Sequence, residues 1–148
     1  MNTRKTLAVA ACAAFTLATC FAAEETDQSL DQILAAAQTE NKPVVLEFTG
    51  SDWCPPCKMM KKEVFSKPAF ADFAKKDIIF VTLDFPRSRE QSESIKARNR
   101  ELAKKFKIEG FPTLVVLDAS GKELGRQVGF MGGGAEAVIG WIKNQAKL

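Results

Sequence analysis

The chain has 148 residues, 46% of them hydrophobic and 26% charged, a balance typical of one soluble globular domain rather than a disordered or collagen-like protein. Its formal charge of +3 falls to +1 without Arg4 and Lys5, because 19 of the 21 basic side chains then face 18 acidic ones. Net charge therefore favours neither nucleic acid nor an anionic membrane surface as a partner. The absence of histidine excludes catalysis and metal binding that depend on it.

Residues 1–23 have the pattern of a secretory signal peptide, with a basic start, an apolar stretch over residues 7–17 and two alanines before Glu24. The apolar stretch is shorter than the roughly 20 residues that a membrane span needs. The sequence thus predicts a signal peptide over 1–23 and one exported domain over 24–148. A retained membrane anchor is the alternative.

The signal region contains two of the four cysteines, Cys12 and Cys20. The residues ending at Cys20 resemble the bacterial lipoprotein box, so attachment to a membrane is expected only if Cys20 is lipidated. Cys54 and Cys57 then remain as one close pair in a compartment that permits disulfides.

The first predicted elements are a helix and a buried strand. Ser29 and Gln32 form a capping-box pattern that starts a helix ending near Asn41. Residues 44–49 form a nearly continuous apolar and β-branched run, as expected of a strand buried on both faces at the centre of a sheet.

The rest of the chain alternates between helices and strands, with breaks at glycine and proline. The patterns predict, in order, a helix over 58–64, an interruption at 66–68, a further helical piece, a strand over 78–83, a helix over 91–107, strands over 113–117 and 123–128 paired as a hairpin, and a final helix after the glycines at 132–134. This order predicts an α/β domain with a mixed, mostly parallel central sheet and helices on both faces.

The Cys54-x-x-Cys57 pair has few candidate functions. A structural zinc site needs four ligands, usually Cys or His, and covalent haem attachment needs histidine where Lys58 stands. An inert staple closing so short a loop would stabilise the fold by only about 2 kcal/mol. A redox-active dithiol remains as the main hypothesis, with no metal and no bound cofactor.

In the redox hypothesis Cys54 lies at the start of a helix, whose dipole favours its thiolate, so Cys54 is the nucleophile and the more buried Cys57 resolves the mixed disulfide. Pro55 and Pro56 have no N–H, so the Cys57 amide is the nearest expected donor to the Cys54 sulfur. We therefore expect a moderate fall in the thiol pKa, which favours a reductase over an oxidase.

Three segments together resemble the thioredoxin family: the hydrophobic strand with Glu47, the motif over residues 53–58, and the turn over residues 110–113. The resemblance spans about residue 43 to the C-terminus and implies a thioredoxin-like fold. The chain also resembles exported members of the family, including the reducing C-terminal domain of the membrane thiol transporter DsbD.

The resemblance implies roles for four further residues. Pro112 would have a cis peptide bond and lie against the cysteines, or be an ordinary trans proline. The Phe111 backbone would pair with an extended substrate. Glu47 would be the buried carboxylate that takes the proton from Cys57, or a solvent-facing glutamate. Trp53 would shield the sulfur and contact substrate, or serve packing alone.

Residues 85–101 are longer than expected of a plain thioredoxin and mix four arginines with three glutamates. They form either a partner surface or a solvated helical insertion.

The main hypothesis is an exported, periplasmic or extracytoplasmic, monomeric enzyme that reduces or isomerises protein disulfides, with electrons from a membrane thiol donor. A binding module for unfolded chains and a dithiol oxidase are the alternatives.

Overall fold

The computed structural model describes residues 27–148, so the predicted signal peptide with Cys12 and Cys20 lies outside the described residues. Within the described range, no helix combines the length and the apolar character that crossing a membrane requires.

Helix α1, Leu30–Glu40, begins with the predicted capping box. The Gln32 N–H donates to Ser29 Oγ at 3.3 Å, and the Ser29 N–H donates to Gln32 Oε1 at 2.8 Å. Two of the helix's first N–H groups thus gain partners. Asn41 ends the helix in the left-handed conformation, at φ 51°.

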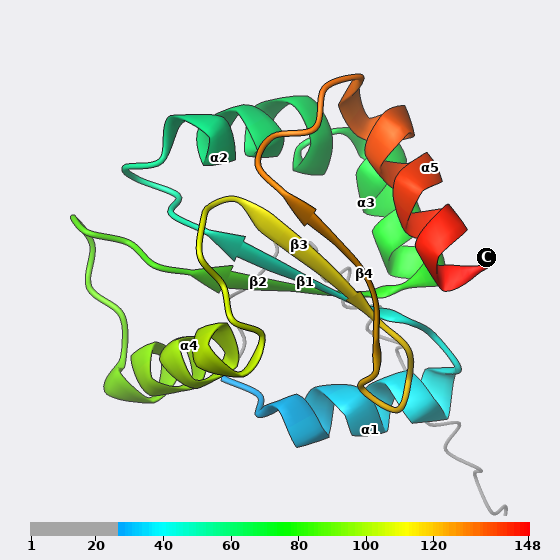
Figure 1. Ribbon diagram of the computed structural model, residues 1–148, viewed down its shortest axis with the longest axis horizontal. Helices are drawn as coiled ribbons and strands as arrows, with labels where there is room; N and C mark the ends of the chain where they lie inside the picture. Colours follow the sequence, from blue (N-terminus) through cyan, green and yellow to red (C-terminus); the bar gives the residue numbers. More distant parts are fainter. Residues whose placement is uncertain (1–26) are drawn as a thin grey trace, which may run out of the picture.

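The remaining elements follow the predicted order (Figure 1). They are β1 Val44–Thr49, α2 Pro55–Met60, a π-helical segment η1 Lys61–Phe65, α3 Pro68–Asp77, β2 Ile79–Asp84, α4 Glu93–Lys105, β3 Thr113–Leu117, β4 Glu123–Val128 and α5 Gly134–Ala146. The predicted interruption near residue 66 is confirmed, because η1 ends at Phe65 and α3 begins at Pro68.

The four strands form one mixed sheet in the order β2-β1-β3-β4. β1 is parallel to β2 but antiparallel to β3, and β3 is antiparallel to β4. The fold class and the hairpin are confirmed, whereas the expectation of a mostly parallel sheet was wrong. Thr113, the first residue of β3, lies opposite Phe48 at the end of β1. The chain between β2 and β3 therefore returns to the end of the sheet that it left, instead of crossing to the other end.

Helices cover both faces of the sheet, with α1 and α4 on one face and α2, α3 and α5 on the other (Figure 1). All six residues of β1 are buried, as predicted for a central strand. Alternate side chains enter the two cores: Phe48 packs with the α1 and α4 side, and Val45 with the α2, α3 and α5 side. Full burial of each such side chain stabilises the fold by about 2 kcal/mol.

One end of the sheet brings distant parts of the sequence together. β1 and β2 end there, since Thr49 lies opposite Asp84, and β3 begins there at Thr113. The loop to α2, the loop after β2 and the turn before β3 all start or finish at this end, and they contain the predicted site residues other than Glu47 and Cys57.

Candidate functional site

The two cysteines form a disulfide at the start of α2. Their Cα atoms lie 5.3 Å apart, and Cys54 is the N-cap residue of the helix. Both residues are buried in this oxidised form, with 3% of Cys54 and 1% of Cys57 exposed. No group of three or more histidine, cysteine or acidic side chains within residues 27–148 is arranged to hold a metal ion.

The first turn of α2 presents one N–H to the Cys54 sulfur. The Cys57 N–H donates to Cys54 Sγ at 3.3 Å, as the sequence predicted, while Pro55 and Pro56 at the first helical positions have no N–H to donate. A helix N-terminus with an N–H near sulfur favours the thiolate over the thiol.

The loop before Cys54 turns tightly on Gly50. The Gly50 carbonyl accepts the N–H groups of Trp53 at 3.3 Å and Cys54 at 3.0 Å. The Trp53 indole lies directly against the glycine, and a Cβ at position 50 would lie 2.5 Å from its Cε2 atom. Only glycine gives the ring this space.

Trp53 and Phe111, two of the predicted substrate-contacting residues, lie together. Their rings meet edge to face with centroids 5.7 Å apart, and the Phe111 ring also contacts Phe85 at 5.3 Å. The Trp53 Nε1–H donates to the Phe85 carbonyl at 2.7 Å, which fixes the indole's orientation. The structure thus builds an aromatic wall from Trp53, Phe85 and Phe111, beside the residue that begins the disulfide.

The Phe111–Pro112 peptide bond is cis, so the alternative of an ordinary trans proline was wrong. Pro112 is buried, and its carbonyl accepts the Gly129 N–H at 2.8 Å. The Thr113 hydroxyl donates to the Gly110 carbonyl at 2.8 Å. Bonds on both sides therefore fix the turn that carries Phe111.

Glu47 is buried in β1, so the alternative of a solvent-facing glutamate was wrong. Only 4% of it is exposed, and its side chain lies on the same face of the sheet as Val45, the face covered by α2. The Thr82 hydroxyl donates to Glu47 Oε2 at 3.0 Å. Loss of water around the carboxylate raises the pKa of Glu47 to about 7, and the charge of Asp84 adds to this effect. Glu47 can therefore gain and lose a proton near neutral pH.

Asp84, at the end of β2, is a second buried carboxylate. It accepts the Ser51 N–H at 2.8 Å, the Ser51 hydroxyl and the Arg89 guanidinium at 2.7 Å. One carboxylate thus joins the loop before the cysteines to the loop after β2. We call residues 85–91 of the latter loop the 85–91 segment.

Asp52 also joins these two loops, but it lies in the loop before the cysteines and accepts hydrogen bonds from the 85–91 segment. It accepts the Arg87 N–H at 3.0 Å, the Ser88 N–H at 2.7 Å and the Ser88 hydroxyl. The hydrogen bonds from the Ser88 hydroxyl and N–H stabilise the carboxylate and lower the pKa of Asp52 to about 2. Arg87 is thereby placed with its Cζ atom 3.8 Å from the Trp53 ring centroid.

The sequence did not indicate that Asp52, Asp84 and Ser88 contribute to the site. The sequence position of Asp84 could have pointed to the site, because a charged residue at the end of a predicted strand lies where neighbouring strands and their loops meet. No sequence pattern pointed to Asp52, because its hydrogen-bond partners lie 35 and 36 residues further along the chain. The helix predicted over residues 91–107 is confirmed as α4.

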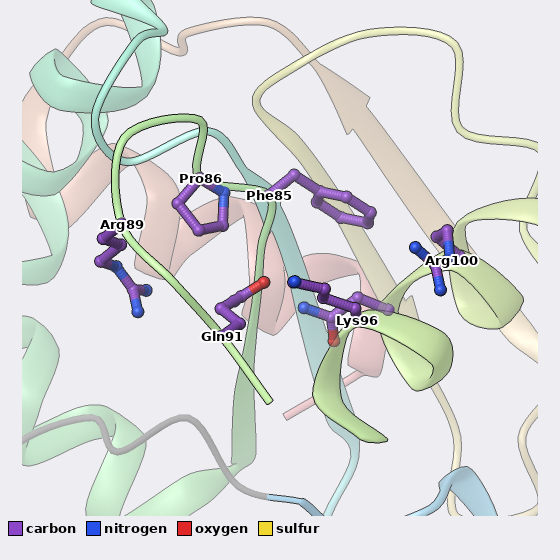
Figure 2. A pocket seen from close by; sticks show the side chains of 7 residues that line it. Phe85, Pro86, Arg89, Gln91, Lys96 and Arg100 are labelled. Carbon is purple, nitrogen blue, oxygen red and sulfur yellow. The ribbon is translucent and has the colours of Figure 1, made fainter. Parts of the chain in front are cut away.

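A surface pocket lies between the 85–91 segment and α4 (Figure 2). Phe85 and Pro86 form one wall, and Arg89 and Arg100 lie on opposite sides of it. Arg89 is paired with Asp84, and Lys96 of the same pocket is paired with a glutamate on α4 at 2.8 Å. Neither the cysteines nor Trp53 line it, so this pocket is separate from the disulfide.

A family model described as a thioredoxin-like domain matches residues 30–146. Among curated proteins, the disulfide bond reductase DsbH of Chlamydia pneumoniae is 38% identical over 121 residues, which are 82% of this chain and 72% of the relative. The thiol:disulfide interchange protein DsbD of Vibrio vulnificus is 37% identical over 106 residues, which are 70% of this chain and 16% of that protein.

Two solved structures extend these similarities. A DsbH oxidoreductase matches with a TM-score of 0.76 and 33% identity, over 99% of this chain and 96% of that chain. The oxidised C-terminal domain of DsbD from Neisseria meningitidis matches with a TM-score of 0.58 and 23% identity, over 78% of this chain and 90% of that chain. The second similarity is one of fold.

Proposed function

Because this chain belongs to the thioredoxin-like family of disulfide oxidoreductases, we propose that it works in the reducing direction, on disulfides of other proteins. The observation that carries the proposal is the Cys54–Cys57 disulfide at the start of α2 with one N–H directed at the Cys54 sulfur. A moderately stabilised thiolate is a good nucleophile and is oxidised readily, whereas an extremely stabilised one favours the oxidase direction.

The first step is attack by the Cys54 thiolate on one sulfur of the substrate disulfide. A new S–S bond joins Cys54 to that sulfur, the substrate S–S bond breaks, and the second substrate sulfur leaves as a thiolate that takes up a proton.

In the second step the Cys57 thiol loses its proton and attacks Cys54 Sγ. The Cys54–Cys57 bond forms, the mixed disulfide breaks, and the remaining substrate sulfur leaves as a thiolate. Two electrons have moved from the protein dithiol to the substrate.

We assign to Glu47 the role of proton acceptor for Cys57. Its carboxylate lies on the α2 face of the sheet, and burial raises the pKa of Glu47 to about 7. A base whose pKa lies near the working pH can both accept and release the proton. Trp53, Phe111 and Pro112 are proposed to hold the substrate segment beside Cys54, supported by the contact between the Trp53 and Phe111 rings.

The dithiol must be restored by another dithiol after each turnover. We propose a membrane thiol donor outside the cytoplasm, since the signal peptide predicted over residues 1–23 would export the domain. The DsbH relative is named a disulfide bond reductase, which agrees with this direction.

The test is a pair of matched cysteine variants with a protein disulfide such as insulin as substrate. Reduced Cys57→Ser is expected to accumulate a mixed disulfide through Cys54, visible on a non-reducing gel, while Cys54→Ser accumulates none. Both variants should reduce the substrate at the uncatalysed rate. A reductase should also have a potential more negative than the glutathione couple at roughly −240 mV.

Two results would favour the rival functions. If Cys54→Ser supported the protein's cellular role, the chain would be a binding module with an incidental disulfide. If the potential lay well above that of glutathione, the same residues would work as an oxidase.

A further inference from the structure

Arg87 differs from Arg89 of the same segment and from Lys96 of α4. Arg89 is paired with Asp84 at 2.7 Å, and Lys96 with Glu93 at 2.8 Å. Arg87 is exposed, and among the described residues no carboxylate lies within ion-pair distance of its guanidinium. Its charge is held instead over an aromatic ring, with Cζ 3.8 Å from the Trp53 centroid.

With Cζ 3.8 Å from the Trp53 centroid, the Arg87 guanidinium lies at the distance of a face-to-face contact with the indole, and such a contact leaves its hydrogen-bonding edge available. A planar guanidinium contacts an aromatic ring through its face, while its N–H groups point outward in the guanidinium plane. Those N–H groups match the two oxygens of a carboxylate. An arginine on Trp53 can therefore bind a carboxylate without leaving the ring.

The backbone of Arg87 is fixed independently of its side chain. Asp52 accepts the N–H groups of Arg87 and Ser88, and Asp52 immediately precedes Trp53. The same short loop thus fixes the position of the indole and of the backbone of Arg87, whose guanidinium lies over the indole. Holding both groups in place lowers the entropy cost of binding a ligand there.

We propose that Arg87 is a specificity-determining residue that selects substrate segments with an Asp or Glu close to the disulfide cysteine. The inference rests on the proposed function, because it assumes that the substrate reaches Cys54 past Trp53. The occupant is an acidic polypeptide segment, argued from the exposed guanidinium of Arg87, which has no ion-pair partner among the described residues and lies over the ring that precedes Cys54.

The experiment uses otherwise identical peptides whose single cysteine is linked by a disulfide to a chromophoric thiol. Glu, Gln or Lys is placed in turn at each of three positions on either side of the cysteine. kcat/KM is measured for the wild-type protein with a chemical dithiol as electron donor. At the best position, Glu should exceed Gln by about fivefold at low ionic strength, and the ratio should shrink with added salt.

Arg87→Gln should reduce the Glu-to-Gln ratio to about one and leave reduction of the Gln peptide within about twofold of wild type. Arg87→Lys should keep part of the preference, since it retains the charge without the planar fork. Arg100→Gln, which removes an exposed arginine on α4, should keep the full preference.

Three results overturn the inference while the protein still reduces peptides. They are equal rates for Glu and Gln at every position, a preference that persists in Arg87→Gln, and an equal loss in Arg100→Gln. Absence of any reduction by the wild-type protein would instead remove the proposed function, and this inference with it.

Discussion

The two sides of the disulfide are built differently. On the helix side, the Cys54 sulfur accepts one N–H from Cys57, and the buried Glu47 accepts the Thr82 hydroxyl. On the loop side, Asp84 and Asp52 each accept several hydrogen bonds that join the loop before the cysteines to the 85–91 segment. Polar groups on the helix side therefore have few hydrogen-bond partners, whereas the carboxylates on the loop side have many and fix the two loops to each other.

Glu47 on the helix side and Asp52 on the loop side have opposite pKa shifts. Burial raises the pKa of Glu47 to about 7, because little compensates for the lost water. Donation from Ser88 lowers the pKa of Asp52 to about 2. Near neutral pH Glu47 can therefore exchange a proton, whereas Asp52 stays ionised and remains a fixed acceptor.

The largest expected effect comes from Glu47→Gln, which removes the titrating group from the helix side. Since the pKa of Glu47 is raised from 4.5 to about 7, the folded state binds the proton more tightly than the unfolded state. The unfolding free energy of the wild type should therefore fall by about 3 kcal/mol as pH rises through that window, and stay low above it. In Glu47→Gln this fall should disappear.

Urea unfolding of the oxidised protein at several pH values between 4 and 8 provides the measurement. Glu63→Gln, which alters an exposed glutamate of η1, should behave as the wild type does. A pH dependence that survives in Glu47→Gln would show that another group causes it.

A smaller effect is expected from Asp84→Asn, which weakens the loop side. Two donors from Ser51 and the Arg89 guanidinium would share one neutral amide oxygen, so we expect a loss of about 2 kcal/mol. Removing the Asp84 charge should also lower the pKa of Glu47 and shift its pH window downward.

Chemical unfolding at one fixed pH measures the first effect, and the pH series measures the second. Asp72→Asn on the exposed side of α3 is the matched control. A stability within about 0.5 kcal/mol of wild type would mean that Asp84 does not hold the two loops together.

The smallest effect should come from Asp52→Asn, and it should be local. Because the pKa of Asp52 is lowered to about 2, its hydrogen bonds are present above the ordinary carboxyl pKa and are lost as pH falls through about 2. The amide NMR signals of Arg87 and Ser88 should report that transition. In Asp52→Asn the transition should vanish, and both amides should exchange faster with solvent. Unchanged exchange would contradict the role given to Asp52.

Local patterns predicted most of the fold. The Ser29–Gln32 capping box, the buried run of β1 and the Cys57 donor all depend on residues within a few positions of one another, and each is confirmed. The cis bond at Pro112 followed from family resemblance. The mostly parallel sheet failed because the direction of β3 depends on where the chain after β2 turns back, which no short pattern encodes.

The loop side of the site could not be predicted for a similar reason. Asp52 and Ser88 are each unremarkable polar residues in the sequence, and only the fold brings them within hydrogen-bond distance. Burial is the main cause of the raised pKa of Glu47, and the strand pattern predicted that burial, whereas the added effect of the Asp84 charge depends on the fold. Contacts between two irregular loops require the tertiary structure.

The bare backbone at Gly50 has a consequence for variants of this protein. The indole of Trp53 occupies the volume that any side chain there would need, and that indole also meets the Phe85 carbonyl, the Phe111 ring and the Arg87 guanidinium. A methyl group added at position 50 would displace the indole and so disturb its contacts with Phe85, Phe111 and Arg87. Gly50→Ala should therefore have the combined effect of removing all three contacts of the indole.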